Sequence, residues 1–432
     1  MKIAFVTLGC KVNQYESQAL GELFEARGHS LVSPEDLPDA VIINSCTVTA
    51  ESDRKSRKSL SHYRRKYPGA VLALIGCYPQ AFPENVKRLE GVDVVLGTRD
   101  KSRVVAAVEE AALTHNRLLD VTEHRDAQME PMQITGFEGR TRAFLKIQDG
   151  CDRFCSYCII PYARGRICSK PLKDAVAEAQ ALARAGFSEL VLVGIDLSAF
   201  GRGQGLCLTD AVEAVAAVPG IRRVRLGSLE PEVLSEKDIE RLTQIENFCP
   251  QFHLSLQSGC DTTLHRMNRH YDTQMYREIA KKLRDAFPGA TLTTDVMVGF
   301  AGETAEEFEA SLNFVREMRF LKVHVFPYSE RSGTRAASFP DPVPKSERHA
   351  RCRRMIEETE KIRRDILNAQ IGHTLQVLIE GKEKNGNSNG FSREYIPVQL
   401  PGEHLTEGQL LEAQVTGVCG DSCVAQMITS RK

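Results

Sequence analysis

Three cysteines in one short segment are the residues whose spacing points most directly to chemistry. Cys151, Cys155 and Cys158 form a C-x3-C-x2-C pattern in the run GCDRFCSYC. Three thiolates packed this closely can hold three corners of a cuboidal iron–sulfur cluster and leave its fourth iron open to an outside ligand. Zinc motifs usually come as paired C-x2-C halves with a fourth ligand, which is missing here. The pattern therefore predicts an iron–sulfur cluster, with a zinc site or coincidence as the alternatives.

Three further cysteines, far apart in the sequence, each lie within three residues of the end of a predicted parallel strand. Cys10, Cys46 and Cys77 follow the apolar runs KIAFVTLG, VIINS and VLALIG. Parallel strands of one sheet end on the same edge, so these thiols are expected to converge on one point and to hold a second cluster. The alternative is that each is buried as a small apolar side chain, as free cysteines often are. The other cysteines show no shared spacing and are assigned to packing.

The elements that must position these cysteines fall into three predicted parts. Residues 1–119 alternate strands with helices, as in an open parallel α/β domain, and residues 120–140 are a polar linker. Residues 141–369 contain six candidate strands with intervening helices, which favours a partial (β/α)6 barrel over a complete eight-unit one. Residues 370–432 contain short strands split by Gly, Asn and Pro turns, as in a small β barrel.

The C-x3-C-x2-C loop comes directly after the first strand of the second part. It therefore lies at the carboxyl end of a strand, where barrel active sites lie. The predicted helices include 16–25, 101–111, 172–185, 305–318 and 345–369. The predicted strands are 3–8, 40–43 and 71–75 in the first part, 143–147, 190–195, 224–226, 252–256, 292–298 and 323–326 in the second, and 375–379, 395–398, 411–418 and 424–428 in the third.

Composition and charge limit the possible classes of function. The chain has 56 Lys and Arg against 57 Asp and Glu, a formal charge of −1, so any nucleic-acid surface must be a local patch. Its longest apolar runs are far below the roughly 18 residues that span a bilayer. The first residues do not fit a secretory signal. We therefore expect a soluble, cytoplasmic protein without a membrane partner.

The strongest local basic patch is the segment 51–66, with seven Lys or Arg and two acidic residues. It follows Cys46 closely, so its charge is expected near the second set of cysteines, where it would fit phosphate groups of a nucleic acid. A solvated helix face is the alternative. The candidate RNA contacts are Arg54, Lys55, Arg57 and Lys58.

The third part is not basic. Residues 370–432 carry five basic and seven acidic side chains, so an RNA contact there has to come from a local face. Phe391, Arg393 and Tyr395 are the candidates for such a face.

Together these motifs resemble the methylthiotransferase family of radical S-adenosylmethionine (SAM) enzymes. The C-x3-C-x2-C loop with an aromatic at Tyr157 is the signature of the radical SAM superfamily. The resemblance extends over nearly the whole chain, as an N-terminal cluster domain, a radical SAM domain and a C-terminal TRAM barrel. Ala301 departs from it, since the family usually has proline there. The runs that carry it are GCKVNQYES, NSCTVT, IGCYPQ, CIIPYARGR, SLQSGCDTTLHRMNRHY, VGFAGET and FPYSERSGTRAA.

The resemblance implies two 4Fe-4S clusters and SAM as cofactors. The cluster at Cys151, Cys155 and Cys158 would cleave SAM to a 5′-deoxyadenosyl radical. The cluster at Cys10, Cys46 and Cys77 would carry the sulfur to be transferred. SAM would lie across the strand ends of the radical SAM domain; taken singly, each residue expected there could instead form a turn or a helix cap. These residues are Gly194, Asp196, Ser228, Glu230, Ser255, Gln257, Asp295 and Gly299.

Within the family, Lys11, Val12 and Gln14 in GCKVNQYES resemble the MtaB-type branch. That resemblance implies tRNA modification by methylthiolation at C2 of N6-threonylcarbamoyladenosine 37, with tRNA, a reductant and a sulfur donor as partners. Methylthiolation of isopentenyladenosine tRNA or of a ribosomal protein is the alternative inside the family. An iron–sulfur RNA-binding or redox-sensing protein without turnover is the alternative of another class.

Overall fold

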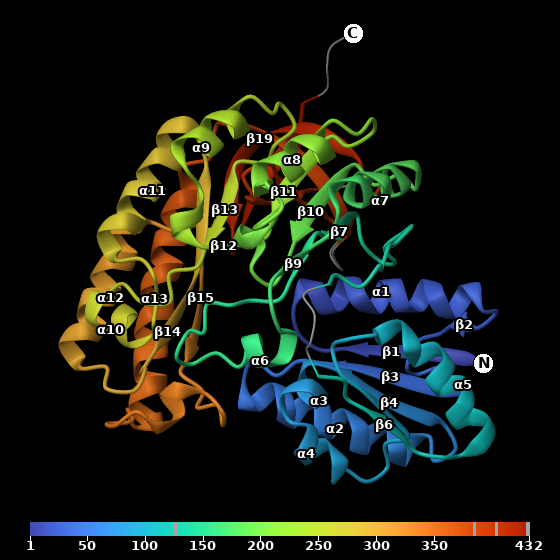
Figure 1. Ribbon diagram of the computed structural model, residues 1–432. Helices are drawn as coiled ribbons and strands as arrows, with labels where there is room; N and C mark the ends of the chain where they lie inside the picture. Colours follow the sequence, from blue (N-terminus) through green and yellow to red (C-terminus); the bar gives the residue numbers. More distant parts are fainter. Residues whose placement is uncertain (124–127, 383–385, 402–404, 429–432) are drawn as a thin grey trace.

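The computed structural model describes residues 1–123, 128–382, 386–401 and 405–428. An N-terminal parallel sheet, a central strand–helix series and a C-terminal β barrel follow one another from blue through green and orange to red in Figure 1. The predicted fold class, mixed α/β with a small all-β barrel at the end, is confirmed.

The N-terminal sheet has six parallel strands in the order β2-β1-β3-β4-β5-β6. Every residue of β3 (Ala40–Ser45) and β4 (Val71–Gly76) is buried, and strands apolar on both sides need cover on both faces. Helix α1 (Lys11–Ala26) packs on one face, and α2 (Ala50–Lys66) covers the other. The remaining elements are β1 (Lys2–Thr7), β2 (Ser30–Leu31), β5 (Val94–Leu96), β6 (Leu118–Asp120), α3 (Cys77–Ala81), α4 (Pro83–Lys87) and α5 (Val104–Thr114).

The central part contains the six predicted strands, arranged in two parallel sheets with the orders β11-β10-β7 and β12-β13-β14-β15. The sheets meet where the backbone N–H of Val224 donates to the carbonyl of Asn247 at 2.9 Å. No pairing joins β7 to β15 in the described residues, so the barrel is open along that side. The strands are β7 (Arg142–Lys146), β10 (Glu189–Val193), β11 (Arg223–Leu226), β12 (Ser228–Leu229), β13 (Gln251–Leu254), β14 (Thr291–Val298) and β15 (Lys322–Pro327).

Helices cover the outside of these strands (Figure 1). Helix α12 (Ala305–Met318) has its predicted bounds because Thr304 and Glu307 form a capping box at its start. No helix within the described ranges combines the length and the hydropathy of a bilayer-crossing segment. The others are α6 (Ile160–Arg164), α7 (Leu172–Arg184), α8 (Leu208–Ala216), α9 (Glu236–Thr243), α10 (Asp261–Arg266), α11 (Thr273–Ala286) and α13 (Lys345–Asn368), with the short strands β8 (Gln148–Asp149) and β9 (Cys168–Ser169) and 3-10 turns at Lys101–Arg103, Leu197–Ala199, Pro231–Val233 and Arg335–Ser338.

The C-terminal part is a closed barrel in the order β16-β17-β18-β20-β19. Its strand β17 (Ser388–Ser392) was not predicted, because the run SNGFS has low strand propensity. The strand forms because β17 pairs with β16 on one side and with β18 on the other. Gly390 permits β17 to lie close to β16, since a Cβ at this position would lie 2.1 Å from the carbonyl oxygen of Leu378. The other strands are β16 (Thr374–Lys382), β18 (Pro397–Leu400), β19 (Leu410–Cys419) and β20 (Ser422–Met427).

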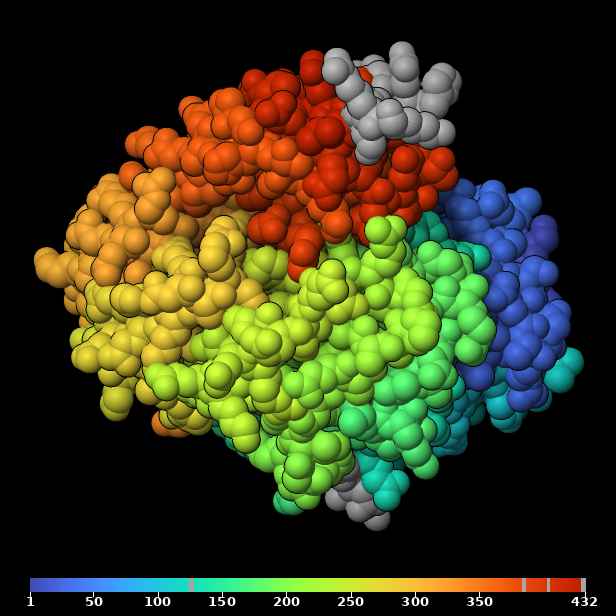
Figure 2. Space-filling model, turned by 90° about the horizontal axis from the view of Figure 1, so that it is seen from above, coloured from blue at the N-terminus to red at the C-terminus, as the bar shows by residue number. Residues whose placement is uncertain are grey.

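The C-terminal barrel packs against the amino ends of the central strands. Arg393 donates through Nη2 to the carbonyls of Glu246 at 2.6 Å and Phe248 at 2.8 Å. In return, Nη1 of Arg225 donates to the carbonyl of Arg393 at 2.9 Å. Seen from above, the barrel (red) lies beside the orange and green segments of the central part (Figure 2). Arg393 is therefore used inside this interface, and not on the outward RNA face for which it was a candidate.

Candidate active site

The cysteines of the C-x3-C-x2-C motif lie on the loop that follows β7 and β8. Gly150 turns the chain into this loop with φ +76°, and a Cβ there would lie 1.9 Å from the carbonyl oxygen of Arg166. The backbone N–H of Cys158 donates to the carbonyl of Cys155 at 3.0 Å, which closes a tight turn. Burial raises the pKa of the Cys158 thiol to about 12, and the neighbouring Cys155 thiolate adds to the rise. Thiols of this kind ionise when a metal takes up their charge, so the donor set fits an iron–sulfur cluster.

Two arginines with largely covered side chains lie at this cysteine loop: Arg153 belongs to the loop itself, and Arg269 reaches it from another segment. Nη1 of Arg269 lies 3.2 Å from Sγ of Cys155, and its Nη2 pairs with Glu230. Nε of Arg153 lies 3.0 Å from Oδ2 of Asp196. Two expected SAM contacts, Asp196 and Glu230, thus lie next to the cysteine loop, each held by an arginine.

Cys10, Cys46 and Cys77 lie close together at the carboxyl edge of the N-terminal sheet, after β1, β3 and β4. Gly9 has φ +115°, and a Cβ there would lie 2.7 Å from the Cβ of Cys46, so the loop before Cys10 runs directly against Cys46. Gly76 turns the chain with φ +99° immediately before Cys77. Burial raises the pKa of Cys77 to about 11, and the Cys46 and Cys10 thiolates add to the rise. The donor set again fits a bound metal cluster.

Arg164, the last residue of α6, joins this second set of cysteines to the central part. Its Nε lies 3.2 Å from Sγ of Cys77, and its Nη1 lies 2.6 Å from Oε1 of Glu16 in α1. Burial alone would raise the pKa of Glu16, but the cations around it hold that pKa well below its ordinary value. Such a buried ionic cluster is sensitive to the loss of one member, because the remaining charges are left unpaired. Its members are Glu16, Lys101, Lys146, Asp149 and Arg164.

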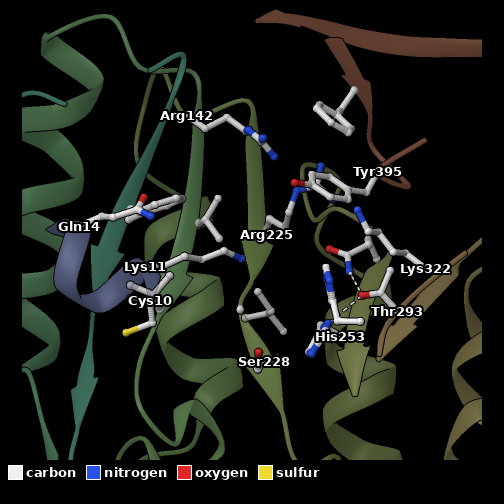
Figure 3. A pocket seen from close by; sticks show the side chains of 18 of the residues that line it. Cys10, Lys11, Gln14, Arg142, Arg225, Ser228, His253, Thr293, Lys322 and Tyr395 are labelled. Atoms are coloured by element: carbon white, nitrogen blue, oxygen red, sulfur yellow. Dashed lines mark hydrogen bonds between the residues drawn. The ribbon is translucent and has the colours of Figure 1, made fainter. Parts of the chain in front are cut away.

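A cavity of 860 Å³ lies between the Cys10 loop, the inner face of the central strands and the C-terminal barrel. This volume lies within the range of about 300–1,000 Å³ that is usual for ligand pockets. Gly194, Ser228 and Asp295, three further expected SAM contacts, line it. Figure 3 shows Cys10 and Lys11 entering from one side, opposite Lys322 and His253. The cavity thus connects the second set of cysteines with the carboxyl ends of the central strands.

Positive side chains outnumber negative ones in the cavity lining. Asp295 is the one Asp or Glu among the described lining residues. Lys11 has no hydrogen-bond or ion-pair partner in the described part of the chain; its Nζ lies 6.0 Å from the centre of the Phe144 ring. Lys11 is exposed to solvent, but the protein atoms around the cavity partly desolvate its ammonium, and this desolvation, followed by repulsion from Arg142 and Arg225, lowers the pKa of Lys11 to about 8. The cations of the lining are Lys11, Arg140, Arg142, Arg225, Lys322 and Arg363.

Two histidines flank Asp295 in this cavity. Nε2 of His253 lies 3.4 Å from Oδ2 of Asp295, and Nδ1 of His253 contacts Oγ1 of Thr293 at 3.0 Å. Burial would raise the pKa of Asp295, but His253 and His324 outweigh it and lower that pKa. Ligand atoms of His253, Asp295 and His324 lie within 4.8 Å of one another, close enough to share a metal ion. The cations of the lining oppose a metal ion here.

The C-terminal barrel supplies an aromatic wall of the cavity. The Phe391 and Tyr395 rings stack at 4.5 Å between centres with 15° between their planes. Arg142 lies 5.2 Å from the centre of the Phe391 ring, and Arg225 lies 4.9 Å from that of Tyr395. These two candidates for an RNA face therefore turn toward the catalytic part of the molecule.

The remaining residues expected to contact SAM lie outside the cavity lining. Ser255 and Gln257 follow β13, and the carbonyl of Ser255 accepts a hydrogen bond of 2.6 Å from the Tyr271 hydroxyl. Gly299 faces α13: a Cβ there would lie 2.4 Å from Cγ of Arg348. The structure therefore groups Gly194, Ser228 and Asp295 with the cavity, and it does not bring Gly299 there.

The four candidate RNA contacts are exposed on α2. Arg54 forms an ion pair of 2.7 Å with Glu51, and Nη1 of Arg57 donates to the Tyr78 hydroxyl at 3.1 Å. Lys55 and Lys58 lie on the same helix. The patch is accessible, although part of its charge is already paired.

Two family models match this chain: Uncharacterized protein family UPF0004 over residues 2–97 and the radical SAM superfamily over residues 145–315. The threonylcarbamoyladenosine tRNA methylthiotransferase MtaB of Bacillus subtilis (strain 168) is 34% identical over 420 residues, which cover 96% of this chain and 93% of that protein. The chain belongs to the radical SAM tRNA methylthiotransferase family. Membership implies a 4Fe-4S cluster, SAM and a tRNA substrate for this methylthiotransferase.

Relatives of two substrate types match this methylthiotransferase. The MtaB protein of Thermotoga maritima is 33% identical and covers 98% of the chain and 97% of that protein. The tRNA-2-methylthio-N(6)-dimethylallyladenosine synthase of Caldicellulosiruptor saccharolyticus is also 33% identical, over 88% of this chain and 83% of that protein. A solved structure of the radical SAM methyltransferase TsrM from Kitasatospora setae shares the fold, with a TM-score of 0.56, 15% identity, and coverage of 75% and 72% of the two chains.

Several residues of the site were given no role from the sequence. Arg164 and Arg269 stand in runs that carry the family resemblance, whereas His253 and His324 have no motif around them, and only the folded chain places these four beside a cysteine or in the cavity. Arg164 stands in the run PYARGR directly after the cysteine loop, which could have marked it.

Proposed function

We propose that this methylthiotransferase acts on N6-threonylcarbamoyladenosine 37 of tRNA and replaces the hydrogen at C2 of the adenine with a methylthio group. One observation carries the proposal: the cavity that reaches Cys10 is lined by six Lys or Arg side chains and one carboxylate. The threonylcarbamoyl group bears a carboxylate, whereas the dimethylallyl group is an uncharged hydrocarbon. A cationic lining favours the anionic modification, because a carboxylate can accept charge-assisted hydrogen bonds from it.

Cys151, Cys155 and Cys158 would hold the radical SAM cluster, and Cys10, Cys46 and Cys77 would hold an auxiliary 4Fe-4S cluster. Bound there, the clusters would supply the electron that cleaves SAM and the sulfur that is transferred. The position of Cys10 on the cavity wall supports this second assignment, since an auxiliary cluster held there would lie beside the cavity.

The chain's own residues would bind and orient the two small ligands. Gly194 and Ser228 line the cavity at the strand ends, where a nucleoside would lie, and Asp196 and Glu230 offer carboxylates close to the cysteine loop. The stacked Phe391 and Tyr395 rings suit a planar base at the opposite wall. The exposed basic residues of α2 would meet tRNA phosphates. A reductant and a sulfur donor complete the list of proposed partners.

Nucleoside analysis tests the proposal. The anaerobically reconstituted protein would be incubated with SAM, a reductant and anticodon stem-loops that carry threonylcarbamoyladenosine, dimethylallyladenosine or unmodified adenosine, and each product would be examined by mass spectrometry. We expect the methylthio product on the threonylcarbamoyl stem-loop. Product on the dimethylallyl stem-loop alone, or on a ribosomal protein with none on RNA, would overturn the proposal.

A further inference from the structure

Lys11 is a cation on the wall of the cavity with no ion-pair partner among the described residues, and Asp295, the one carboxylate of the described lining, feels its charge only through space. Figure 3 shows its side chain pointing across the cavity toward Arg225, and its nearest charged neighbours on that side, Arg142 and Arg225, are also cations. Arg225 is held by Glu189 at 2.9 Å, and Arg142 pairs with Glu380, so these two arginines already have partners. The ammonium of Lys11 has none among the described residues. Lys11 is exposed to the solvent of the cavity, and an anionic ligand there would give its ammonium the partner that the chain does not supply.

The position of Lys11 fits the geometry of the proposed substrate. In adenine, C2 and C6 are separated only by N1, so a substituent on N6 and the hydrogen on C2 lie along the same edge of the base. A group that reads the N6 substituent must therefore lie close to the group that delivers sulfur to C2. Lys11 directly follows Cys10, a cysteine assigned to the auxiliary cluster, and both line the cavity. One short loop would thus hold both the side chain that recognises the N6 substituent and a cysteine of the cluster that delivers sulfur to C2.

We propose that Nζ of Lys11 binds the carboxylate of the threonylcarbamoyl group and is the residue by which this methylthiotransferase selects an anionic adenosine modification. This inference rests on the proposed function and assigns its specificity to one side chain. Lys322 and Arg142 complete the positive surroundings in the same lining.

The SAM carboxylate and an RNA phosphate are two other anions that could meet Lys11. The radical SAM resemblance implies that the open iron takes up the SAM carboxylate, at the loop of Cys151, which does not line this cavity. Backbone phosphates would meet the exposed basic helix α2 instead. The test below separates these sources of negative charge.

Binding of two matched stem-loops to the reconstituted holoprotein tests the inference. One stem-loop carries threonylcarbamoyladenosine, and the other carries its threonine methyl ester, which lacks the charge and is larger by one methyl group. Wild-type protein is expected to bind the acid roughly 10- to 100-fold more tightly than the ester, as for the loss of a charge-assisted hydrogen bond. Lys11→Met is expected to bind both with similar affinity. Lys237→Met, on the exposed side of α9, serves as the matched control and should keep the wild-type preference.

Iron content and SAM cleavage are measured for every variant. Lys11→Met should load iron as wild type does and should cleave SAM to 5′-deoxyadenosine at the wild-type rate, because the lysine does not bind SAM. If Lys11→Met fails to load iron, Lys11→Gln provides a second neutral variant for the same comparison. The inference is overturned if an iron-loaded neutral variant retains the preference for the acid, if SAM cleavage falls in parallel with RNA binding, or if wild type does not distinguish acid from ester. Absence of methylthio product from the wild-type protein with the acid stem-loop would instead count against the proposed function.

Discussion

The two cysteine sites of this protein are built in opposite ways from the same ligands. Cys151, Cys155 and Cys158 occupy one loop, so their spacing along the chain already holds the thiols together. Cys10, Cys46 and Cys77 come from three loops and meet only because β1, β3 and β4 are adjacent and parallel. A local site depends on a loop, whereas a distributed site depends on the whole sheet.

Despite this difference, each site has one buried arginine against one sulfur. Arg269 lies 3.2 Å from Sγ of Cys155 and is held by Glu230, and Arg164 lies 3.2 Å from Sγ of Cys77 and is held by Glu16. Hydrogen bonds to cysteine sulfurs are one means by which proteins set the potential of an iron–sulfur cluster. The comparison suggests that the two sites are tuned alike but assembled differently.

The largest effect is expected from separating the two sites. Cys46→Ala should abolish the methylthio product but still cleave SAM, because the loop of Cys151 is intact. Mass spectrometry of the tRNA nucleosides and chromatography of 5′-deoxyadenosine check the two activities. Iron should fall from about eight to about four per chain when one whole set is replaced by Ala. Full methylthiolation by Cys46→Ala, or about four irons in fully reconstituted wild type, would show that the distributed site holds no cluster.

A large effect on stability is expected from Arg164→Leu. This change leaves Glu16 with one cation fewer in a fully buried cluster, which should cost about 3–5 kcal/mol and lower the Tm. Arg354→Leu is the control: it breaks a 2.6 Å pair with Glu309 on the surface and should cost at most about 1 kcal/mol. Thermal unfolding of the metal-free proteins, followed by circular dichroism, measures both. Equal Tm values for the two variants would contradict the role given to Arg164 at the domain interface.

A smaller and more selective effect is expected on redox potential. Arg269→Lys and Arg164→Lys keep the charge but shorten the reach to sulfur, so each should lower the potential of its own cluster and leave the other unchanged. Potentiometric titration followed by electron paramagnetic resonance measures each potential. The signals of the two clusters are separated by using variants in which one set of cysteines, that of Cys151 or that of Cys10, is replaced by Ala. If a single arginine substitution shifted the reduction potentials of both clusters, the proposal that each arginine acts on its own site would be wrong.

The smallest effect is expected on the surface next to the distributed site. Changing Arg54, Lys55, Arg57 and Lys58 to Ser should weaken tRNA binding and reduce its salt dependence. The binding constant falls with salt, and the slope of its logarithm against the logarithm of the salt concentration is about 0.9 for each duplex phosphate that is neutralised. The slope should fall by less than the amount expected for the loss of four phosphate contacts, because Arg54 is already paired with Glu51. Iron content should not change. Binding isotherms at three salt concentrations decide the matter, and an unchanged slope would exclude α2 as the tRNA contact.

Much of the fold could be predicted because it depends on local patterns. The bounds of α12 follow from the Thr304 cap and its apolar period, and the six central strands appear as apolar runs between helices. The strand β17 could not be found in this way, because its residues favour turns and only pairing on both sides extends them. Propensity fails where tertiary pairing determines the local structure.

The sequence by itself determined the family, the three-part architecture and the two sets of cysteines, because these are properties of spacing and periodicity along the chain. The tertiary structure alone decided which charges meet. It placed Arg164 against Cys77 and left Lys11 unpaired between two arginines. It also turned Phe391 and Tyr395 toward the cavity and used Arg393 for packing. The physical reason is that burial and ion pairing depend on distances between residues that are far apart in the sequence, 87 positions for Arg164 and Cys77, and no local pattern encodes those distances.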